Sequence, residues 1–474
     1  MFRYILMARS NRALAVRPWV VLTCLSVLQF LIAVDVTIVN IALPSIGRAF
    51  DVEQNTLPWV VIAYTVTGGG LLMLGGRLAD AFGRRNLLFI GAIVFGLASL
   101  AAGLAGSFFV LVIARILQGV GEALALPAAM AMIVLLFPDG SARSRALSIW
   151  AAISSCGLVL GFLLSGIIVQ FLGWRWIFLI AVPIVVLILV TAAAILPRDK
   201  PRDRKPLDVL GSILLTCAPL LLSYGIVEFG NEREIGWFPL FAFVGALVAA
   251  ALFVKVERRA RNPVIPLSFF RNRSRTRANL TTALLSAALS TSFLLFTFSL
   301  QDRLRLSALQ SGLMLVPLAA CLVIAVLVVP RLLGRWGARN CSLAGIIFAA
   351  LGLMLIALAD QVDAPVSALV PAMLLTAFGM GLGLIGLQYV AVTDVTDDDA
   401  GVASGVQRAA DQLGGSTGVA LYIGMGFSPS MAGVSPYLLS SGFAVTGLVV
   451  AAFIASGIAS KRLVKPNSPA RCES

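Results

Sequence analysis

Long apolar runs separated by short polar stretches dominate the pattern of this chain. Each run approaches or exceeds the roughly 20 residues that a helix needs to cross the hydrocarbon core of a bilayer. The pattern therefore predicts an all-helical, polytopic membrane protein with 14 spans. The expected spans are 18–41, 57–76, 87–105, 108–137, 146–171, 176–196, 209–227, 237–254, 278–300, 309–329, 341–358, 366–392, 402–425 and 436–458. The remaining stretches are too short for a separate catalytic domain.

The composition supports a membrane protein and argues against an enzyme. Of the 474 residues, 59% are hydrophobic and 12% are charged, whereas soluble domains have about 45–50% and about 25%. The chain has no His, which excludes histidine-dependent catalysis and the commonest zinc ligand. Its six Cys show no C-x-x-C spacing, so we expect apolar packing rather than disulfides or a metal site. We expect no enzymatic activity, no metal and no cofactor.

The basic residues predict how the chain is oriented. Most of the 36 Lys and Arg fall in alternate connections between the spans, and cytoplasmic connections are the basic ones. We therefore expect a multi-pass protein of the cell membrane with both termini in the cytoplasm. The net charge of +14 then reports topology, and we expect no nucleic-acid partner. The connection before 402–425 is acidic instead, and we interpret its four Asp as caps for the following helix: Asp394, Asp397, Asp398 and Asp399.

Internal similarity predicts two related halves. The loops 77–85 and 331–339 share Arg-Leu, a central Gly and a final Arg, and the spans 146–171 and 402–425 share a glycine-rich stretch. The first six spans therefore match the last six, a repeat that is common in transporters. We expect an N-terminal six-helix bundle at 1–197, basic linkers and a two-helix insert at 198–277, and a C-terminal six-helix bundle with a cytoplasmic tail at 278–474.

Four stretches resemble motifs of the major facilitator superfamily, in its 14-span drug:proton antiporter branch. They are DVTIVNIALP at 35–44, GRLADAFGRR at 76–85, RILQGVG at 115–121, and WRWIF at 174–178 followed by Pro183. The resemblance implies a major facilitator fold of two six-helix bundles plus an inserted helix pair. It also implies alternating access and transport that uses the proton gradient as its energy source, with no further cofactor.

One of these motifs has a functional role in that family. The resemblance implies that the loop after the second span forms a cytoplasmic gate. The residues of this gate motif are Gly76, Asp80, Gly83, Arg84 and Arg85. Gly83 permits a tight turn, and Asp80 can pair with either Arg. The alternative is a basic anchor with a capped helix end.

The fifth span resembles the family's antiporter helix but departs from its pattern. The family has Pro where this chain has Phe162, and Gly where it has Ser165, while Gly157, Gly161 and Gly166 match. In the family this helix is associated with exchange of substrate against ions. The direction of coupling therefore stays open at this point, and the larger side chains are expected to limit close approach of a neighbouring helix.

Three ionisable residues lie inside predicted spans: Asp35, Arg115 and Glu122. Such a residue costs at least about 2.5–3.5 kcal/mol at the bilayer centre and is a functional candidate by default. Asp35 and Arg115 lie at matching depths, and the resemblance implies that their two spans both line the central cavity, so the pair could touch. The contact would be either a proton or substrate site or a buried salt bridge that fixes the fold. Glu122 follows Arg115 by almost two turns and shares its face. Without a basic partner, Glu122 is the preferred proton-exchanging or cation-binding group, the alternative being a hydrated acid near the inner mouth.

Further polar residues are weaker candidates. Asn40, Tyr64, Gln118 and Gln388 could line the substrate path or instead form hydrogen bonds between helices. Arg408 and Asp411, at i and i+3, are expected to form a local ion pair.

These features predict a proton-coupled exporter of amphipathic, cationic organic compounds, that is, multidrug efflux with a role in antibiotic resistance. The expected partners are a small-molecule substrate, protons and the lipid bilayer, and the expected oligomeric state is a monomer. A second interpretation is dedicated export or import of a single metabolite with coupling other than antiport. A third is a membrane sensor or scaffold that transports nothing.

Overall fold

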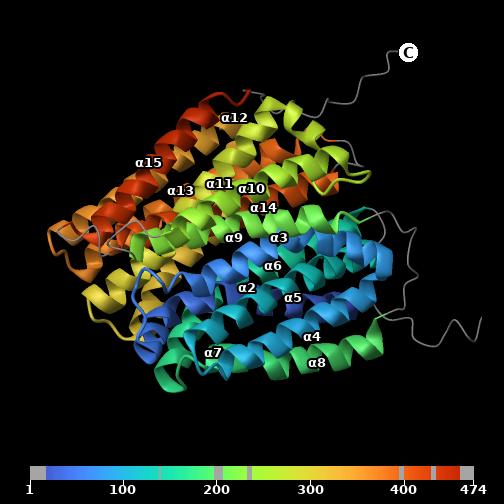
Figure 1. Ribbon diagram of the computed structural model, residues 1–474, viewed down its shortest axis with the longest axis horizontal. Helices are drawn as coiled ribbons and strands as arrows, with labels where there is room; N and C mark the ends of the chain where they lie inside the picture. The colour runs from blue at the N-terminus through green and yellow to red at the C-terminus, as the bar shows by residue number, and fades with distance from the viewer. Residues whose placement is uncertain are drawn as a thin grey trace, which may run out of the picture.

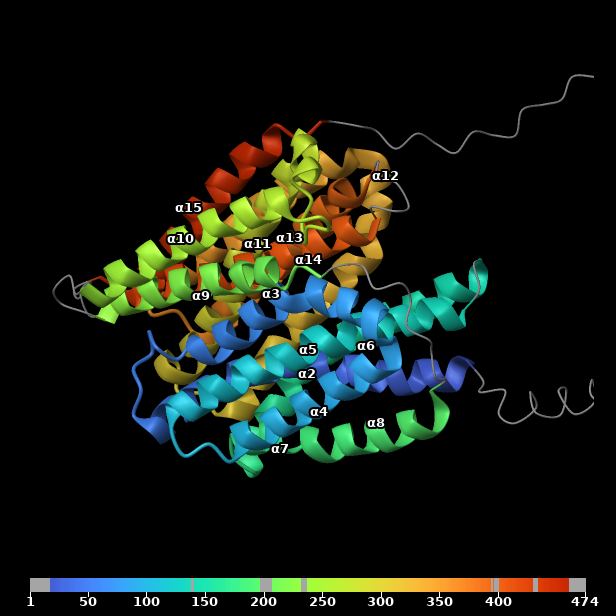
Figure 2. The same cartoon turned by 45° about the vertical axis from the view of Figure 1, so that its right-hand side comes forward.

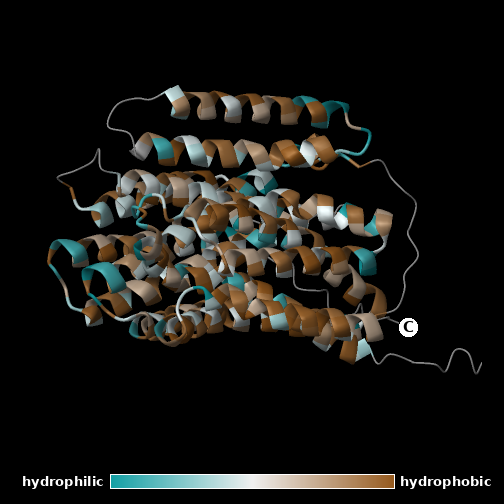
Figure 3. Ribbon diagram, turned by 60° about the horizontal axis from the view of Figure 1, so that its bottom comes forward, coloured by the Kyte–Doolittle hydropathy of each residue, from teal (hydrophilic) through white to brown (hydrophobic). Residues whose placement is uncertain are grey.

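The computed structural model describes residues 18–137, 140–196, 207–231, 237–393, 395, 400–428 and 434–459. Throughout these ranges the regular structure is helical, with no strand. Twelve of the helices in these ranges are long and apolar enough to cross a membrane, judged by length and composition. Apolar residues extend along the helices, and hydrophilic residues gather mainly at helix ends (Figure 3). The all-helical membrane architecture predicted from the sequence is confirmed.

The helices fall on two sides of the molecule, as Figures 1 and 2 show. The N-terminal side contains α2 (Pro18–Phe50), α3 (Trp59–Phe82), α4 (Arg84–Gly103), α5 (Phe108–Leu136), α6 (Ser141–Phe171), α7 (Trp176–Leu179) and α8 (Ala181–Ile195). The C-terminal side contains α11 (Arg273–Phe298), η2 (Ser299–Arg303), α12 (Ala308–Gln361), α13 (Val366–Val392), α14 (Ala400–Val419), η3 (Ala420–Gly424) and α15 (Pro436–Ser456). The two sides meet where α3 packs on α14 and where α6 packs on α12.

The span count differs from the 14 that the sequence predicts. α12 contains two predicted spans: its 54 residues break at Gly337, whose φ of 77° and ψ of 158° are not helical. As one straight helix it would be about 80 Å long, far more than a bilayer core. α14, at the place of the predicted span 402–425, is not among the twelve candidates, because polar and small residues interrupt its sequence.

Helix boundaries follow local sequence signals. Gly83 separates α3 from α4 with a φ of 94°, a conformation that glycine adopts without steric cost. Ser107 caps α5 by accepting a hydrogen bond from the Val110 amide at 3.3 Å. α12 begins with a capping box in which Ser307 and Gln310 bond each other's backbone amides. The acidic connection at 394–399, which was expected to cap the next helix, lies largely outside the described residues.

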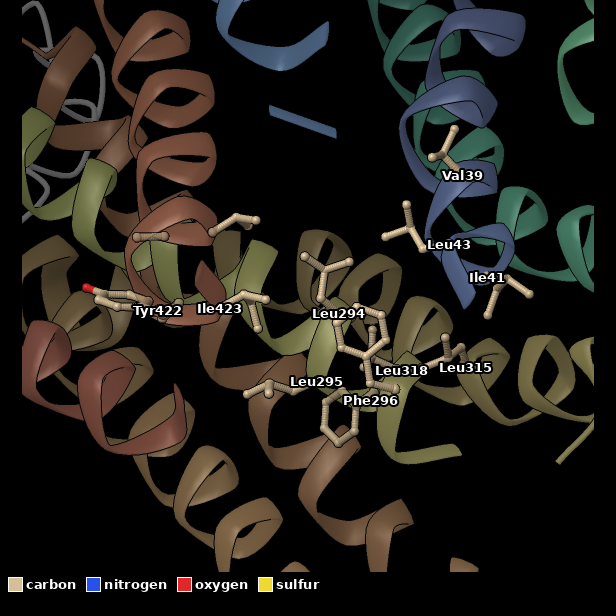
Figure 4. Packing of buried hydrophobic residues seen from close by; sticks show 14 of the residues in the cluster. Val39, Ile41, Leu43, Leu294, Leu295, Phe296, Leu315, Leu318, Tyr422 and Ile423 are labelled. Carbon is tan, nitrogen blue, oxygen red and sulfur yellow. The ribbon is translucent and has the colours of Figure 1, made fainter. Parts of the chain in front are cut away.

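At one end of the molecule an apolar cluster joins the two sides (Figure 4). Val39, Ile41 and Leu43 of α2 belong to the same buried cluster as residues 294–296 of α11 and Leu315 and Leu318 of α12. Two hydrogen bonds across the sides accompany it. The Gln301 amide donates to the Ile41 carbonyl at 2.8 Å, and the Gln54 amide donates to Asp302 Oδ2 at 2.8 Å. The two sides are therefore in contact at this end.

Two helices, α9 (Val209–Asn231) and α10 (Trp237–Arg259), lie at the place of the predicted inserted pair. α9 packs on α10, α3 and η3. The segment that follows α10 is held from two directions, because the Arg77 guanidinium of α3 donates to the carbonyls of Asn262, at 2.6 Å, and Pro263. From α10, the Glu257 carboxylate accepts the Val264 amide at 3.1 Å.

The same segment forms a small apolar cluster with four helices. Val264 and Ile265 are buried in it. The cluster also includes η1 residue Phe269 and side chains from α3, α9, α10 and α14, namely Met73, Leu215, Phe253, Ala403 and Val406. We call residues 260–266 the interdomain strap, because they connect the inserted pair to both sides of the molecule.

Candidate functional site

A cavity of about 350 Å³ lies half-way along the helices, between the two sides. Its lining comes from α2, α3, α5 and α6 on one side and from α11, α12, α13 and α14 on the other. A larger hollow of about 510 Å³ lies beside Lys255 and Arg259, at the exposed end of α10. We take the central cavity as the candidate site, because it alone of these two contacts both sides of the protein.

The lining combines apolar walls with many polar groups. Its charged residues are Glu122, Arg408 and Asp411, which give a formal charge of minus one. Its uncharged polar side chains are Gln29, Thr37, Asn40, Thr65, Ser154, Ser155, Ser290, Gln412 and Ser416. Such a surface suits an amphipathic ligand that has hydrogen-bonding groups and a positive charge.

Asp35 and Arg115 are in contact, as their matching depths predict. Arg115 Nη1 lies 2.6 Å from Asp35 Oδ2, and the two side chains are 1% and 4% exposed. Arg115 also donates to the Val60 carbonyl at 2.8 Å and to Gln118 Oε1 at 2.9 Å. The Tyr64 ring covers the guanidinium at 4.2 Å. Neither charged residue lines the cavity, so the structure favours the buried salt bridge between the two alternatives for this pair.

The other predicted lining residues divide between two environments. Asn40 lines the cavity. Tyr64 and Gln118 do not, because they complete the network around Arg115, in which the Gln118 amide donates to Ser99 Oγ at 2.9 Å. Gln388 is exposed on α13, outside the lining. Tyr64 and Gln118 thus follow the alternative expectation, contacts between helices, whereas Gln388 fits neither alternative.

Glu122 lies at the cavity and is 1% exposed. Its Oε1 accepts a hydrogen bond from the Gln412 amide of α14 at 3.4 Å, and its Oε2 has no hydrogen-bond partner. Glu122 makes no salt bridge within the described part of the chain. An ionisable group enclosed within a span and without a salt bridge is a functional candidate by default.

Arg408 and Asp411 do not form the local ion pair that their spacing predicts. No salt bridge joins these two residues. Asp411 Oδ1 instead accepts a hydrogen bond from the Ser286 hydroxyl of α11. Both residues line the cavity, so their charges face the candidate site.

The predicted gating motif lies at the α3–α4 turn. Arg84 Nη2 lies 2.9 Å from Asp80 Oδ1, so Arg84 is the partner of Asp80. Arg85 donates to the Ala193 carbonyl of α8 at 3.0 Å. A Cβ added to Gly76 would lie 3.7 Å from Pro127 Cβ of α5. The motif thus ties the turn to its own side of the molecule.

The antiporter-like helix α6 packs closely on two neighbours. Gly157 and Gly161 lie against α2, and Gly166 lies against Gly312 of α12. Ser165 donates to the Ile38 carbonyl of α2. The close approach is therefore kept despite the two larger side chains. The Phe162 ring instead lines the cavity, with its centroid 5.2 Å from that of Phe293 on α11.

Several lining residues were not found from the sequence. Gln29 donates to Ser154 Oγ at 2.7 Å across α2 and α6. On α2, residues 29, 37 and 40 share a helix face, and this polar stripe within an apolar span was a usable signal. Gln412 and Ser416 form a similar i, i+4 pair on α14.

The fold and the cavity define a class of protein: a polytopic membrane carrier with a polar site enclosed between two groups of helices. The chain belongs to the Major Facilitator Superfamily, whose profile matches residues 25–419.

The chain is similar to two relatives along most of its length and to one solved structure in fold. The chain is 47% identical over 450 residues to the lincomycin resistance protein of Streptomyces lincolnensis, covering 94% of this chain and 93% of that protein. It is 36% identical over 413 residues to the puromycin resistance protein pur8 of Streptomyces alboniger, covering 85% and 81%. In fold it resembles the crystal structure of the nucleoside transporter NupG, with a TM-score of 0.67, 14% identity and coverage of 92% and 98%.

Proposed function

We propose that this protein exports amphipathic, cationic organic compounds, including antibiotics, in exchange for protons. The central observation is the enclosed Glu122 carboxyl in a cavity that both sides of the protein line. The similarity to the lincomycin and puromycin resistance proteins supports efflux as the task. Lincomycin and puromycin are therefore the first cargoes to test.

The coupling follows from competition at one carboxyl. When Glu122 is ionised, the lining has a formal charge of minus one and attracts a cation; when Glu122 is protonated, that attraction is removed. A proton and a cationic cargo thus weaken each other's binding, and such linkage is reciprocal. Movement of the two sides about the cavity would expose it alternately to each face of the membrane.

The proposed topology is that of the sequence prediction. We propose 14 spans, with α12 counted as two and α14 continued by η3 counted as one, and both termini in the cytoplasm. The domains are the N-terminal bundle 1–197, the linkers and insert 198–277, and the C-terminal bundle with its tail 278–474. Transport requires the bilayer, protons and the cargo, and we propose a monomer without a bound cofactor.

A narrower task is the second candidate. The cavity volume of about 350 Å³ lies near the lower end of the range for small-molecule sites, which is about 300–1,000 Å³. Phe162, at the place of the family's Pro, occupies part of its wall. Both features suit the second candidate, dedicated export or import of a single metabolite with coupling other than antiport.

Drug accumulation in cells tests the proposal and separates the two candidates. Cells with the protein should accumulate less lincomycin or puromycin than cells without it, and a proton uncoupler should abolish the difference. A Glu122→Gln variant, matched in size and expressed at the same level, should export poorly. A panel of unrelated dyes shows the breadth of the profile. Equal accumulation of every compound in both strains would contradict export.

A further inference from the structure

Glu122 and Gln412 form a contact between the two sides of the protein inside the cavity. Glu122 belongs to α5 and Gln412 to α14, and the Gln412 amide donates to Glu122 Oε1 at 3.4 Å. Both side chains rest on α3. A Cβ added to Gly68 would lie 3.0 Å from Glu122 Oε2, and one added to Gly69 would lie 2.8 Å from Gln412 Oε1. The two consecutive glycines provide the space for this contact.

Each partner keeps one buried oxygen without a hydrogen-bond donor. These atoms are Glu122 Oε2 and Gln412 Oε1. An unsatisfied buried acceptor destabilises the arrangement that contains it. An ionised Glu122 carboxylate only accepts hydrogen bonds. It therefore has no hydrogen to donate to Gln412 Oε1, and this oxygen stays without a donor.

One proton on Glu122 changes this balance. A carboxylic acid has a donor as well as an acceptor, and a primary amide has both. We propose that protonated Glu122 forms two hydrogen bonds with the Gln412 amide, so that proton binding fastens α14 to α3 and α5, and proton loss loosens this contact. The inference rests on the proposed function and identifies Gln412 as a positioning residue for it.

The groups that face Glu122 come from four helices: Asp35 on α2, Tyr64 on α3, Arg115 on α5, and Arg408 and Asp411 on α14. Asp35 and Arg115 neutralise each other, and Asp411 accepts from Ser286. Arg408 lies one turn before Gln412 on α14 and lines the same cavity.

Tyr64 is the competing donor. Its hydroxyl lies close to the Glu122 carboxyl but does not meet the geometry of a hydrogen bond. If Tyr64 rather than the proton satisfied Glu122, the contact with Gln412 would be insensitive to pH. The variant Tyr64→Phe keeps the ring over Arg115 and removes only the hydroxyl, which makes it the matched control.

Cross-linking between α3 and α14 reports how closely these two helices are held together. A Cβ at Gly405 of α14 would lie 3.1 Å from Met73 Cγ of α3, so Met73→Cys with Gly405→Cys gives a reporter pair across the contact between these two helices. The six native cysteines are first replaced by Ala or Ser in the full chain. Cross-linking rates are measured at acidic and alkaline pH and divided by those of the Gln412→Leu variant, which corrects for the pH dependence of thiol chemistry.

The proposal makes a distinct prediction for each variant. The corrected rate should be about threefold to tenfold higher at acidic pH, the effect of one or two hydrogen bonds. Glu122→Gln, whose amide imitates the protonated acid, should give the high rate at both pH values. Tyr64→Phe should keep the pH response. The exchange Glu122→Gln with Gln412→Glu should restore a response, because one acid and one amide again face each other, and it also shows that the site still folds.

Other results would overturn the proposal. The uncorrected cross-linking rates of the reporter protein and of its Gln412→Leu variant are also compared. If both change with pH to the same extent, the Gln412 amide is not the partner of Glu122. A low rate in Glu122→Gln would exclude the doubly bonded pair. Lincomycin-induced proton release by the wild-type protein is measured on the same preparation. If cross-linking behaves as predicted but lincomycin releases no protons, the proposed function is refuted and the contact is supported. If lincomycin releases protons but cross-linking does not depend on pH, only the proposed contact is refuted.

Discussion

Arg115 Nη1 lies 2.6 Å from Asp35 Oδ2, and both side chains are enclosed by protein. The pair joins α2 to α5 beside the cavity without lining it. Its Arg also bonds the Val60 carbonyl of α3, so three helices of the N-terminal side meet at one guanidinium. The two charges cancel, which leaves Glu122, Arg408 and Asp411 to set the charge of the site.

The buried pair predicts a large effect of removing one partner. Asp35→Asn should destabilise the protein by about 3–5 kcal/mol, because it leaves the Arg115 charge buried and uncompensated. Asp35→Leu with Arg115→Met should recover much of that loss. Unfolding in detergent measures both, with Asp80→Asn as the control, since the Asp80 side chain is 58% exposed. Equal stability of the Asp35 and Asp80 variants would show that the pair is unimportant for the fold.

The interdomain strap predicts a second effect on stability. Glu257 accepts the amides of Val264 and Ile265, so Glu257→Leu leaves both donors unsatisfied and should cost about 1–3 kcal/mol. Protease cleavage within residues 260–266 should become faster in Glu257→Leu, because the strap opens more often when it is less stable. Arg258→Ala is the control, because Arg258 is an exposed neighbour on α10. Unchanged cleavage in Glu257→Leu would mean that apolar packing alone holds the strap.

Phe162 is expected to limit the range of cargoes. Phe162→Ala removes the ring that faces Phe293 and enlarges the cavity, so larger compounds should become substrates while selectivity among small ones declines. Resistance profiles over a graded series of compounds measure this. Phe171→Ala is the matched control, because that ring is 70% exposed on the same helix. An identical profile for the wild type and Phe162→Ala would place the selective wall elsewhere.

Arg408 is expected to oppose cationic cargo. Arg408→Gln takes away the positive charge of the lining, so KM for a cationic compound should fall by about twofold to fivefold, the size of a partly solvated charge interaction. Transport of a neutral compound should change little. Arg145→Gln provides the control at an exposed site on α6. A higher KM for the cation would mean that Arg408 contacts the cargo or holds another cavity residue in place.

The sequence predicted the helices well because long apolar runs have one stable solution in a bilayer. It also predicted the contact of Asp35 with Arg115, since helix geometry converts position into depth. It left open whether Tyr64 and Gln118 line the cavity or contact other helices, because one helix face does not reveal which neighbour covers it. In the structure both complete that network. The Arg408 and Asp411 pairing was wrong for a related reason: the partner of Asp411, Ser286, comes from a helix distant in sequence.

The strap shows a second limit of sequence analysis. The basic linker after α10 was interpreted from its charge alone, whereas its role in the structure depends on Glu257, Val264 and Ile265. Those contacts form only when four helices from different parts of the chain converge, and no local pattern predicts them.

Lincomycin-induced proton release from reconstituted vesicles tests the central claim most directly. The wild-type protein should release protons when the cargo binds, and Glu122→Gln should release few or none, while Asp363→Asn, at an acid whose side chain is 95% exposed, should behave as the wild type does. Full release by the Glu122→Gln variant would contradict the account, because another group would then exchange the proton.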